Sequence, residues 1–217
     1  MTLSKRLFDV LVAAALVGVF ALPILALLGL VLILQGRPLF YISERMQAPG
    51  RPFQLWKLRT MTVAPDGGGV SGGDKAARIT RIGHVLRATR LDEVPQLWNI
   101  LKGDISFVGP RPPLRIYVER FPDLYARVLQ SRPGVTGLAT LRYHAVEERL
   151  LARCSTPEQT DSVYAGRCIP RKAQLDLLYQ KNWSLCLDMR LMWETLKSVL
   201  LRRVAQMLGG KPPNGVA

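Results

Sequence analysis

The longest apolar run of the chain extends from Val10 to Leu34, 25 residues without a charged side chain. It exceeds the ~7–15 residues of a secretory signal peptide's apolar region, and no small-residue cleavage site ends it. Pro23 divides the run into segments of 13 and 11 residues. As helices these would be roughly 20 Å and 16 Å long, so neither alone crosses a hydrocarbon core of about 30 Å. The pattern predicts a membrane-associated helix-break-helix.

Positive residues lie at both ends of this run, Lys5 and Arg6 before it and Arg37 and Arg45 after it. A helix that spans the membrane usually has its Lys and Arg residues concentrated on the cytoplasmic side. The flanking charges therefore favour a re-entrant hairpin that enters and leaves by the same face. A kinked span stays open as the alternative, because transmembrane helices tolerate proline.

After Leu34 the pattern changes to short apolar pieces separated by Gly and Pro. Residues 40–42 suggest a short extended segment, and residues 52–59 alternate apolar and polar side chains as a half-buried strand does. Residues 63–75 contain five glycines and predict a surface loop, without the spacing of a phosphate-binding P-loop.

Two helices are predicted at residues 79–90 and 92–102, the second with Val94, Leu97 and Leu101 on one buried face. Pro95 then falls in the first turn, where a missing backbone N–H is tolerated. This placement puts Asp92 and Glu93 at the start of the helix. Such carboxylates can be plain helix caps, or groups that the helix terminus keeps ionised for nucleophilic attack.

Charge narrows the choice of partners. The chain has 30 Lys and Arg against 16 Asp and Glu, a formal net charge of +14. Such a balance favours anionic partners, which are nucleic acid, phospholipid head groups or phosphorylated substrates. The three cysteines have neither zinc-site nor disulfide-framework spacing.

The basic residues gather around the carboxylate pair: Arg78, Arg81, Arg87 and Arg90 precede it, and Arg111 follows between prolines. Transfer between two phosphates needs such a setting, because arginines hold phosphate oxygens and a divalent metal offsets repulsion. Some of these arginines are expected simply to face solvent or lipid head groups.

At these residues the sequence resembles the bacterial sugar transferase family, the monotopic phosphoglycosyl transferases. The matching motifs follow one another in family order over roughly residues 3–200: Lys5-Arg6-Leu7-Phe8-Asp9, Lys57-Leu58-Arg59-Thr60-Met61, Leu91-Asp92-Glu93-Val94-Pro95-Gln96-Leu97-Trp98-Asn99, Leu101-Lys102-Gly103-Asp104, Val108-Gly109-Pro110-Arg111-Pro112, Arg132-Pro133-Gly134-Val135-Thr136-Gly137 and Asn182-Trp183-Ser184-Leu185. Each is weak alone, and together they are specific.

The resemblance implies a compact α/β catalytic domain on a re-entrant membrane helix, at the cytoplasmic face of the bacterial inner membrane. The expected parts are an anchor over residues 1–36, a catalytic domain over residues 37–208 and a disordered tail over residues 209–217. Helices are expected at residues 147–153 and 172–181, and an amphipathic, membrane-surface helix at residues 198–208. The implied reaction moves a sugar 1-phosphate from a UDP-sugar to polyprenyl (undecaprenyl) phosphate, with Mg²⁺, at the start of cell-surface glycan or exopolysaccharide assembly.

Carried over residue by residue, Asp92 is the expected nucleophile, which forms an aspartyl-phosphosugar intermediate. Glu93 is the expected acid/base or metal-supporting partner, so that Asp92 and Glu93 together would hold the Mg²⁺ ion. Substrate phosphate binding is implied for four basic residues: Lys57, Arg59, Arg87 and Arg111.

The sequence departs from the family in places. Leu22-Pro23 stands where Ser-Pro is usual, and Arg90 stands where a small hydroxyl residue is common. Two rival functions are a membrane-anchored nucleic-acid-binding protein, which the charge allows, and a non-catalytic scaffold. Neither is favoured, because nucleic-acid-binding motifs are absent from the sequence and both carboxylates are present, so no nucleic-acid partner is expected. The motifs specify neither the sugar nor the oligomeric state.

Overall fold

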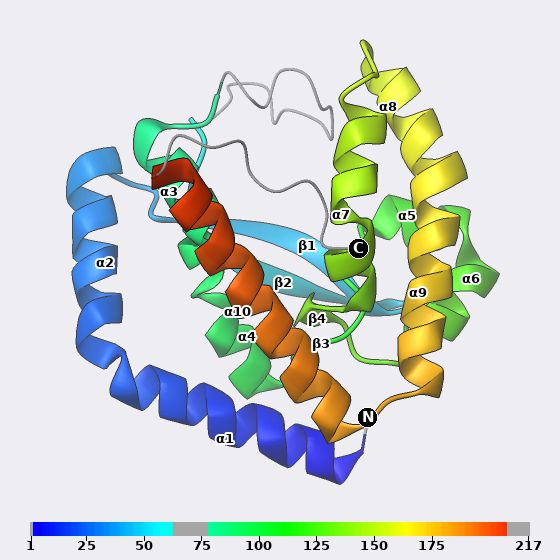
Figure 1. Ribbon diagram of the computed structural model, residues 1–217, viewed down its shortest axis with the longest axis horizontal. Helices are drawn as coiled ribbons and strands as arrows, with labels where there is room; N and C mark the ends of the chain where they lie inside the picture. The colour runs from blue at the N-terminus through cyan, green and yellow to red at the C-terminus, as the bar shows by residue number, and fades with distance from the viewer. Residues whose placement is uncertain (1, 63–77, 208–217) are drawn as a thin grey trace.

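The computed structural model describes residues 2–62 and 78–207, with side chains up to residue 201. The described chain is rich in helix and carries two small two-stranded sheets, an arrangement compatible with the predicted α/β class (Figure 1). The predicted loop at residues 63–75 and the predicted tail at residues 209–217 lie outside the described residues.

The N-terminal apolar run forms two helices, α1 (Leu3–Val19) and α2 (Ala21–Gln35), bent by 69° to each other. The break lies at Phe20, three residues before the expected Pro23, because proline has no N–H for the Val19 carbonyl and its ring clashes with that group. The two segments are therefore 17 and 15 residues long. No helix among the described residues is both long enough and apolar enough to cross a membrane by itself. This bent pair, taken together, has the length and the apolar composition to do so.

The pair is followed by a hairpin of β1 (Phe40–Ala48) and β2 (Arg51–Leu58) in antiparallel register, with Phe40 opposite Leu58. Gly50, at φ +71°, makes the tight connection that a side chain would strain. The predicted strand at residues 52–59 is confirmed within one residue at each end. The first strand is longer than expected and continues through Arg45 to Ala48.

The predicted helix at residues 79–90 is α3 (Arg81–Thr89), capped by the Thr80 hydroxyl, which accepts from the Gly83 N–H at 3.0 Å. A single 3₁₀ turn, η1 (Leu91–Glu93), follows, and α4 (Gln96–Lys102) begins only afterwards. The prediction that Asp92 and Glu93 begin the α-helix is therefore wrong. Bonds between residues three apart, such as Val94 N–H to the Leu91 carbonyl, continue the tighter geometry up to Pro95.

A second sheet pairs β3 (Ser106–Val108) and β4 (Gly134–Thr136) in parallel, with α5 (Arg115–Arg120) and α6 (Pro122–Val128) between them in sequence. The strands meet where glycines face one another. A Cβ on Gly109 would lie 2.1 Å from the Arg132 carbonyl oxygen, and one on Gly134 would lie 2.2 Å from the Gly109 nitrogen. Only glycine permits this approach, which fixes the chain directly before Pro110 and Arg111.

The C-terminal third is helical: α7 (Leu138–Leu151), α8 (Pro157–Val163), a π-helical turn η2 (Tyr164–Cys168), α9 (Ile169–Lys181) and α10 (Leu185–Met207). The helix expected at residues 172–181 lies within α9, and those expected at residues 147–153 and 198–208 overlap the C-terminal parts of α7 and α10, which end at Leu151 and Met207. Each observed helix begins earlier and is longer than predicted. In Figure 1, α10 crosses the front of the molecule while α1 runs along its lower edge.

The hairpin lies between separate apolar clusters. One joins Met46 of β1 to α5, α6 and α9, and another joins Phe53 and Leu55 of β2 to Ala13 of α1 and Ile100 of α4. The N-terminal helix pair is thus packed onto the same body that carries the β1–β2 hairpin and the carboxylate turn.

Candidate active site

The carboxylate pair lies in a turn whose backbone is fixed on both sides. Arg90, before the turn, has φ +57° and is the one described residue other than glycine with a positive φ. Such a conformation is costly for a side-chain-bearing residue and is found where surrounding structure enforces it. It ends α3 and turns Asp92 and Glu93 toward β2.

Glu93 is held between two cations. Lys57 Nζ of β2 donates to Glu93 Oε1 at 2.9 Å, and Arg90 Nε lies 3.7 Å from Glu93 Oε2. Burial alone would raise the pKa of Glu93, but Lys57, Arg90 and Arg111 outweigh it, so the pKa lies below its ordinary value. The Glu93 carboxylate is therefore held ionised.

Asp92 differs from its neighbour. It is half-buried and accepts no hydrogen bond from the residues that the structure describes. Burial and the adjacent Glu93 carboxylate raise the pKa of Asp92, although Lys57, Arg87 and Arg90 oppose the shift. A carboxylate without a hydrogen-bond donor keeps its lone pairs free for an incoming electrophile.

The basic residues predicted for the site divide into two groups. Lys57 contacts the pair directly, Arg87 of α3 faces Asp92, and Arg111 acts on Glu93 and Lys57 from the segment after β3. Arg87 Nε also donates to the Thr60 hydroxyl at 2.9 Å, which fixes its position at the end of β2. The structure therefore brings five of the six predicted residues together.

Arg59 is the sixth, and its guanidinium lies elsewhere. It donates to the carbonyl oxygens of Gln35 and Gly36, the latter at 3.1 Å, and so holds the C-terminal end of α2. Alternation along β2 puts Arg59 on the face of Lys57, but its long side chain reaches away from the carboxylates. Its role in phosphate binding stays a prediction.

One basic residue at the site was not predicted. Arg45 of β1 was interpreted from the sequence as a charge flanking the membrane run, yet its side chain lies beside Arg111. Burial, with Arg111 adding to it, lowers the pKa of Arg45. The alternating stretch Ser43-Glu44-Arg45-Met46 was the sequence signal for a longer β1. A strand extended through these residues puts Arg45 and Met46 on opposite faces.

The residues around the turn fit a divalent cation. Glu93 Oε2 is buried and has no hydrogen-bond partner among the described residues, and the neighbouring Asp92 carboxylate is likewise unbonded. Two carboxylates supply the hard oxygen ligands that Mg²⁺ takes, usually with water and substrate phosphate completing the shell. No cluster of three or more His, Cys, Asp or Glu suited to a metal occurs in the described part of the chain.

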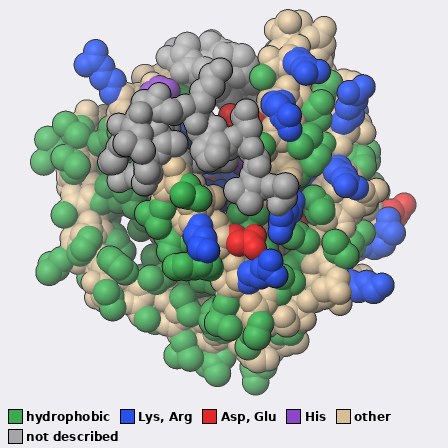
Figure 2. Space-filling model, viewed as in Figure 1, with side chains coloured by type: hydrophobic (Ala, Val, Ile, Leu, Met, Phe, Trp, Pro, Cys, Tyr) green, Lys and Arg blue, Asp and Glu red, His purple; other side chains and the backbone are tan. Residues whose placement is uncertain are grey.

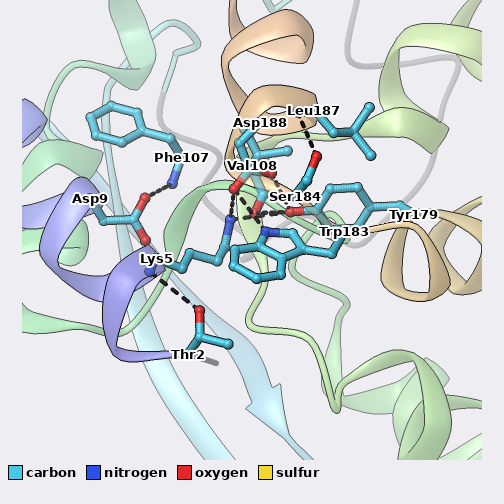
Figure 3. A network of polar contacts seen from close by, with 10 residues as sticks. All are labelled: Thr2, Lys5, Asp9, Phe107, Val108, Tyr179, Trp183, Ser184, Leu187 and Asp188. Atoms are coloured by element: carbon cyan, nitrogen blue, oxygen red, sulfur yellow. Dashed lines mark hydrogen bonds and ion pairs between the residues drawn. The ribbon is translucent and has the colours of Figure 1, made fainter.

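Behind the site a buried polar network ties α1 to the C-terminal helices (Figure 3). Lys5 Nζ forms an ion pair with Asp188 of α10 and donates to the Tyr179 hydroxyl at 3.1 Å. Trp183 Nε1 donates to the same Asp188 carboxylate at 3.0 Å, and the Phe107 N–H of β3 donates to Asp9 at 3.3 Å. This network holds β3, and hence the Arg111 segment, against α1.

Comparisons with known proteins identify the family of the chain. The model of the family described as bacterial sugar transferase matches residues 1–202. Over 204 residues the chain is 38% identical to the UDP-glucose:undecaprenyl-phosphate glucose-1-phosphate transferase of Caulobacter vibrioides, covering 91% of this chain and 70% of that protein. It is 30% identical to the UDP-N-acetylgalactosamine-undecaprenyl-phosphate N-acetylgalactosaminephosphotransferase of Aeromonas hydrophila, covering 90% of this chain and 43% of that protein.

A third relative, the exopolysaccharide production protein ExoY of Rhizobium meliloti, is 31% identical over 217 residues, covering 93% of this chain and 87% of that protein. The motifs quoted from the sequence, the match over nearly the whole chain and these relatives agree with one another. The chain therefore belongs to the bacterial sugar transferase family, and it is an enzyme of the transferase class.

Proposed function

We propose that the protein transfers a sugar 1-phosphate from a UDP-sugar to undecaprenyl phosphate, as an early step in exopolysaccharide or other cell-surface glycan assembly. The observation that carries the proposal is the Asp92 carboxylate. It is half-buried, accepts no hydrogen bond from the described residues, and has Lys57, Arg87 and Arg90 near it. The names of the relatives supply the donor and acceptor classes.

The chemistry proceeds in two displacements. A carboxylate oxygen of Asp92 attacks the phosphorus attached to the sugar, and the bond from that phosphorus to the bridging oxygen breaks. The nucleoside monophosphate departs with the electron pair of that bond. A phosphate oxygen of the acceptor then attacks the phosphosugar on Asp92, which frees the carboxylate for another cycle.

The roles of the surrounding residues follow from their charges. Arg87 is placed beside Asp92 by Thr60, where it can hold the oxygens of the phosphate under attack. Lys57 and Arg111 keep Glu93 ionised, which suits a metal-supporting carboxylate better than a general acid. Asp92 and Glu93 would hold Mg²⁺, whose charge offsets the repulsion between the carboxylate and the donor phosphates.

A re-entrant placement in the cytoplasmic leaflet is supported by the attachment of both ends of the helix pair to one body. At the start of α1, Arg6 donates to the carbonyl oxygens of Ile100 and Leu101 of α4 at 2.5 and 2.7 Å. At the end of α2, Gln35 Nε2 donates to the Arg59 carbonyl at 3.1 Å. Since the two ends are held on the same globular part, the pair enters and leaves the bilayer from one side.

The outer surface of the molecule fits this placement. Hydrophobic side chains gather over α1 and α2 (Figure 2), and α10 also presents Trp193, Leu196 and Leu200, each about half exposed. Such apolar area needs a partner of low polarity, and Trp suits the membrane interface. We assign residues 1–36 to the anchor and residues 37–208 to the catalytic part on the cytoplasmic face.

The decisive experiment is a transfer assay with undecaprenyl phosphate and a panel of radiolabelled UDP-sugars, using the full chain and Asp92→Asn. The amide keeps the shape of the side chain but lacks the nucleophilic oxygen charge, so turnover and trapped phosphosugar adduct should both be lost. Asp123→Asn, at an exposed position of α6, is the matched control and should retain both. A phosphosugar adduct on a residue other than Asp92 would sink the assignment.

A further inference from the structure

A cavity of about 610 Å³ has Arg111 in its lining, whereas neither Asp92 nor Glu93 lines it. Its lining includes Arg45 of β1 and Arg111, together with Tyr125, Tyr164 and Asp176 from α6, η2 and α9. Arg111 belongs both to this lining and to the surroundings of Glu93. A ligand could therefore extend from the carboxylates past Arg111 into the cavity, whose size suits a small organic molecule.

Two of the lining residues are arginines that form no ion pair within the described part of the chain. Arg45 and Arg111 lie close enough to perturb each other, and neither forms an ion pair with a described residue. Arg45 Nε is buried without a hydrogen-bond partner in the described part, and its Nη1 reaches only the Pro112 carbonyl at 3.4 Å. Two adjacent guanidinium groups with no protein anion between them are suited to an anionic ligand such as phosphate.

The lining also includes a carboxyl group and aromatic rings. Asp176 is 7% exposed and lines the cavity, yet it has no hydrogen bond to any residue that the structure describes. Buried polar groups usually have partners, so one without any at a cavity wall points to a ligand that supplies a donor. Tyr164 lies in the π-helical turn η2, a rare conformation that often occurs at functional sites.

We propose that this cavity binds the nucleoside monophosphate half of the donor, with Arg45 and Arg111 on the departing phosphate and Asp176 on hydroxyl groups of the ribose. The inference rests on the proposed function. In phosphoryl transfer the attacking and leaving oxygens lie roughly in line. Arg87 and Arg90 lie near Asp92, whereas Arg111 lies near Glu93 and also lines the cavity. We therefore place the leaving nucleoside monophosphate on the side of Arg111 and the cavity.

The test measures binding of UMP and of glucose 1-phosphate to the full chain by calorimetry. Arg45→Met should weaken UMP binding by about tenfold or more, because it removes charge-assisted hydrogen bonds, and Arg45→Lys should recover only part. Asp176→Asn should also weaken UMP binding while leaving glucose 1-phosphate unchanged. Arg127→Met and Asp123→Asn, both at exposed positions of α6, are the matched controls and should bind UMP as the unmodified chain does.

The outcomes separate this inference from the proposed function. If Arg45→Met and Asp176→Asn bind UMP normally while the unmodified enzyme transfers sugar phosphate, the cavity assignment is wrong and the proposed function stands. If these variants weaken glucose 1-phosphate and not UMP, the cavity takes the sugar half and the inference is overturned. If the unmodified chain binds UMP in an Arg45-dependent way but transfers no sugar phosphate, the nucleotide site stands and the proposed function fails. Thermal unfolding of each variant checks that the chain is folded.

Discussion

Asp92 and Asp176 are both carboxyl groups that burial makes harder to ionise, but their surroundings differ. Three cations, Lys57, Arg87 and Arg90, oppose the upward pKa shift of Asp92. Only Lys172 opposes it at Asp176, and Lys172 is itself paired with Glu147 at 2.9 Å. The first setting favours an ionised nucleophile, and the second favours a protonated or ligand-bonded carboxyl group.

Asp176 gives a prediction on stability against pH. Burial raises the pKa of Asp176 to about 7, from an ordinary value of 3.8, so the folded protein binds more protons than the unfolded chain between these values. The free energy of unfolding should therefore fall as pH rises from about 4 to about 7. Asp176→Asn has no such proton to lose, and its stability relative to the unmodified protein should improve across that window.

Denaturant unfolding of the full chain in detergent at pH 5 and pH 8 measures this change. Asp123→Asn, which is exposed, should show the same difference from the unmodified protein at both pH values. If Asp176→Asn shows a constant difference as well, Asp176 is ionised in the folded protein throughout and the assignment of its proton is wrong.

At the scale of elements, α3 positions Arg87 through one close contact. A Cβ on Gly83 would lie 2.1 Å from the Thr60 carbonyl oxygen, so α3 approaches the end of β2 only because residue 83 is glycine. The same approach brings Arg87 Nε within 2.9 Å of the Thr60 hydroxyl. The helix therefore sets the distance between Arg87 and Asp92.

Gly83→Ala should push α3 away from β2 and weaken the Arg87 contact. Overpacking of this kind costs about 1–3 kcal/mol, and the transfer rate should fall by about tenfold or more because Arg87, which we propose holds the donor phosphate, is displaced. Gly18→Ala is the control, since a Cβ there meets nothing within 4 Å in the structure. Equal activity of the two variants in the transfer assay would contradict the argument.

Elements with a clear period were predictable from the sequence, and those without one were not. Alternation identified the β2 strand, whereas β3 and β4 have three residues each and owe their pairing to glycines far apart in sequence. The carboxylate turn was placed at an α-helix start because the apolar spacing of α4 was extended back across Pro95. Arg45 was not predicted as a residue near Arg111, because its positive charge was attributed to the flank of the apolar run.

At the scale of the whole molecule, charges that the sequence assigns to the membrane flank serve the protein interior. Lys5 is 6% exposed and is bound by Asp188 and Tyr179, and Arg6 bonds to the end of α4. Of the four flanking cations, Arg37 alone is exposed in the described structure. The attachment of both ends of the α1–α2 pair to one body thus supports a re-entrant helix pair more directly than the flanking charges do.

Changing one partner of the Lys5–Asp188 ion pair should lower the stability of the protein more than changing both partners together. Lys5→Met leaves the Asp188 carboxylate buried with the Tyr179 and Trp183 donors only, and should cost about 3–5 kcal/mol of stability. Lys5→Met combined with Asp188→Asn should cost less than the sum of the single changes. A double-mutant cycle from denaturant unfolding measures the coupling. The control is the surface pair Arg190→Met and Glu194→Gln, whose side chains are 71% and 30% exposed. Additive losses would show that the pair is not coupled.

The last prediction concerns topology. In the unmodified protein a cysteine at position 2 should react only from the cytoplasmic side of intact membranes, because Lys5 and Arg6 hold the start of α1 on the catalytic body. Pro23→Ala restores an N–H for the Val19 carbonyl and should let the apolar run of 25 residues form one helix of roughly 37 Å, long enough to span. Part of the Pro23→Ala population should then expose position 2 to the periplasm.

For the labelling experiment, Cys154 and Cys186 are replaced by serine and the buried Cys168 is kept. Asp123→Cys on the exposed surface of α6 marks the cytoplasmic side. Periplasmic labelling of position 2 in the chain that retains Pro23 would show a full span and overturn the hairpin, while leaving the chemistry proposed for Asp92 in place.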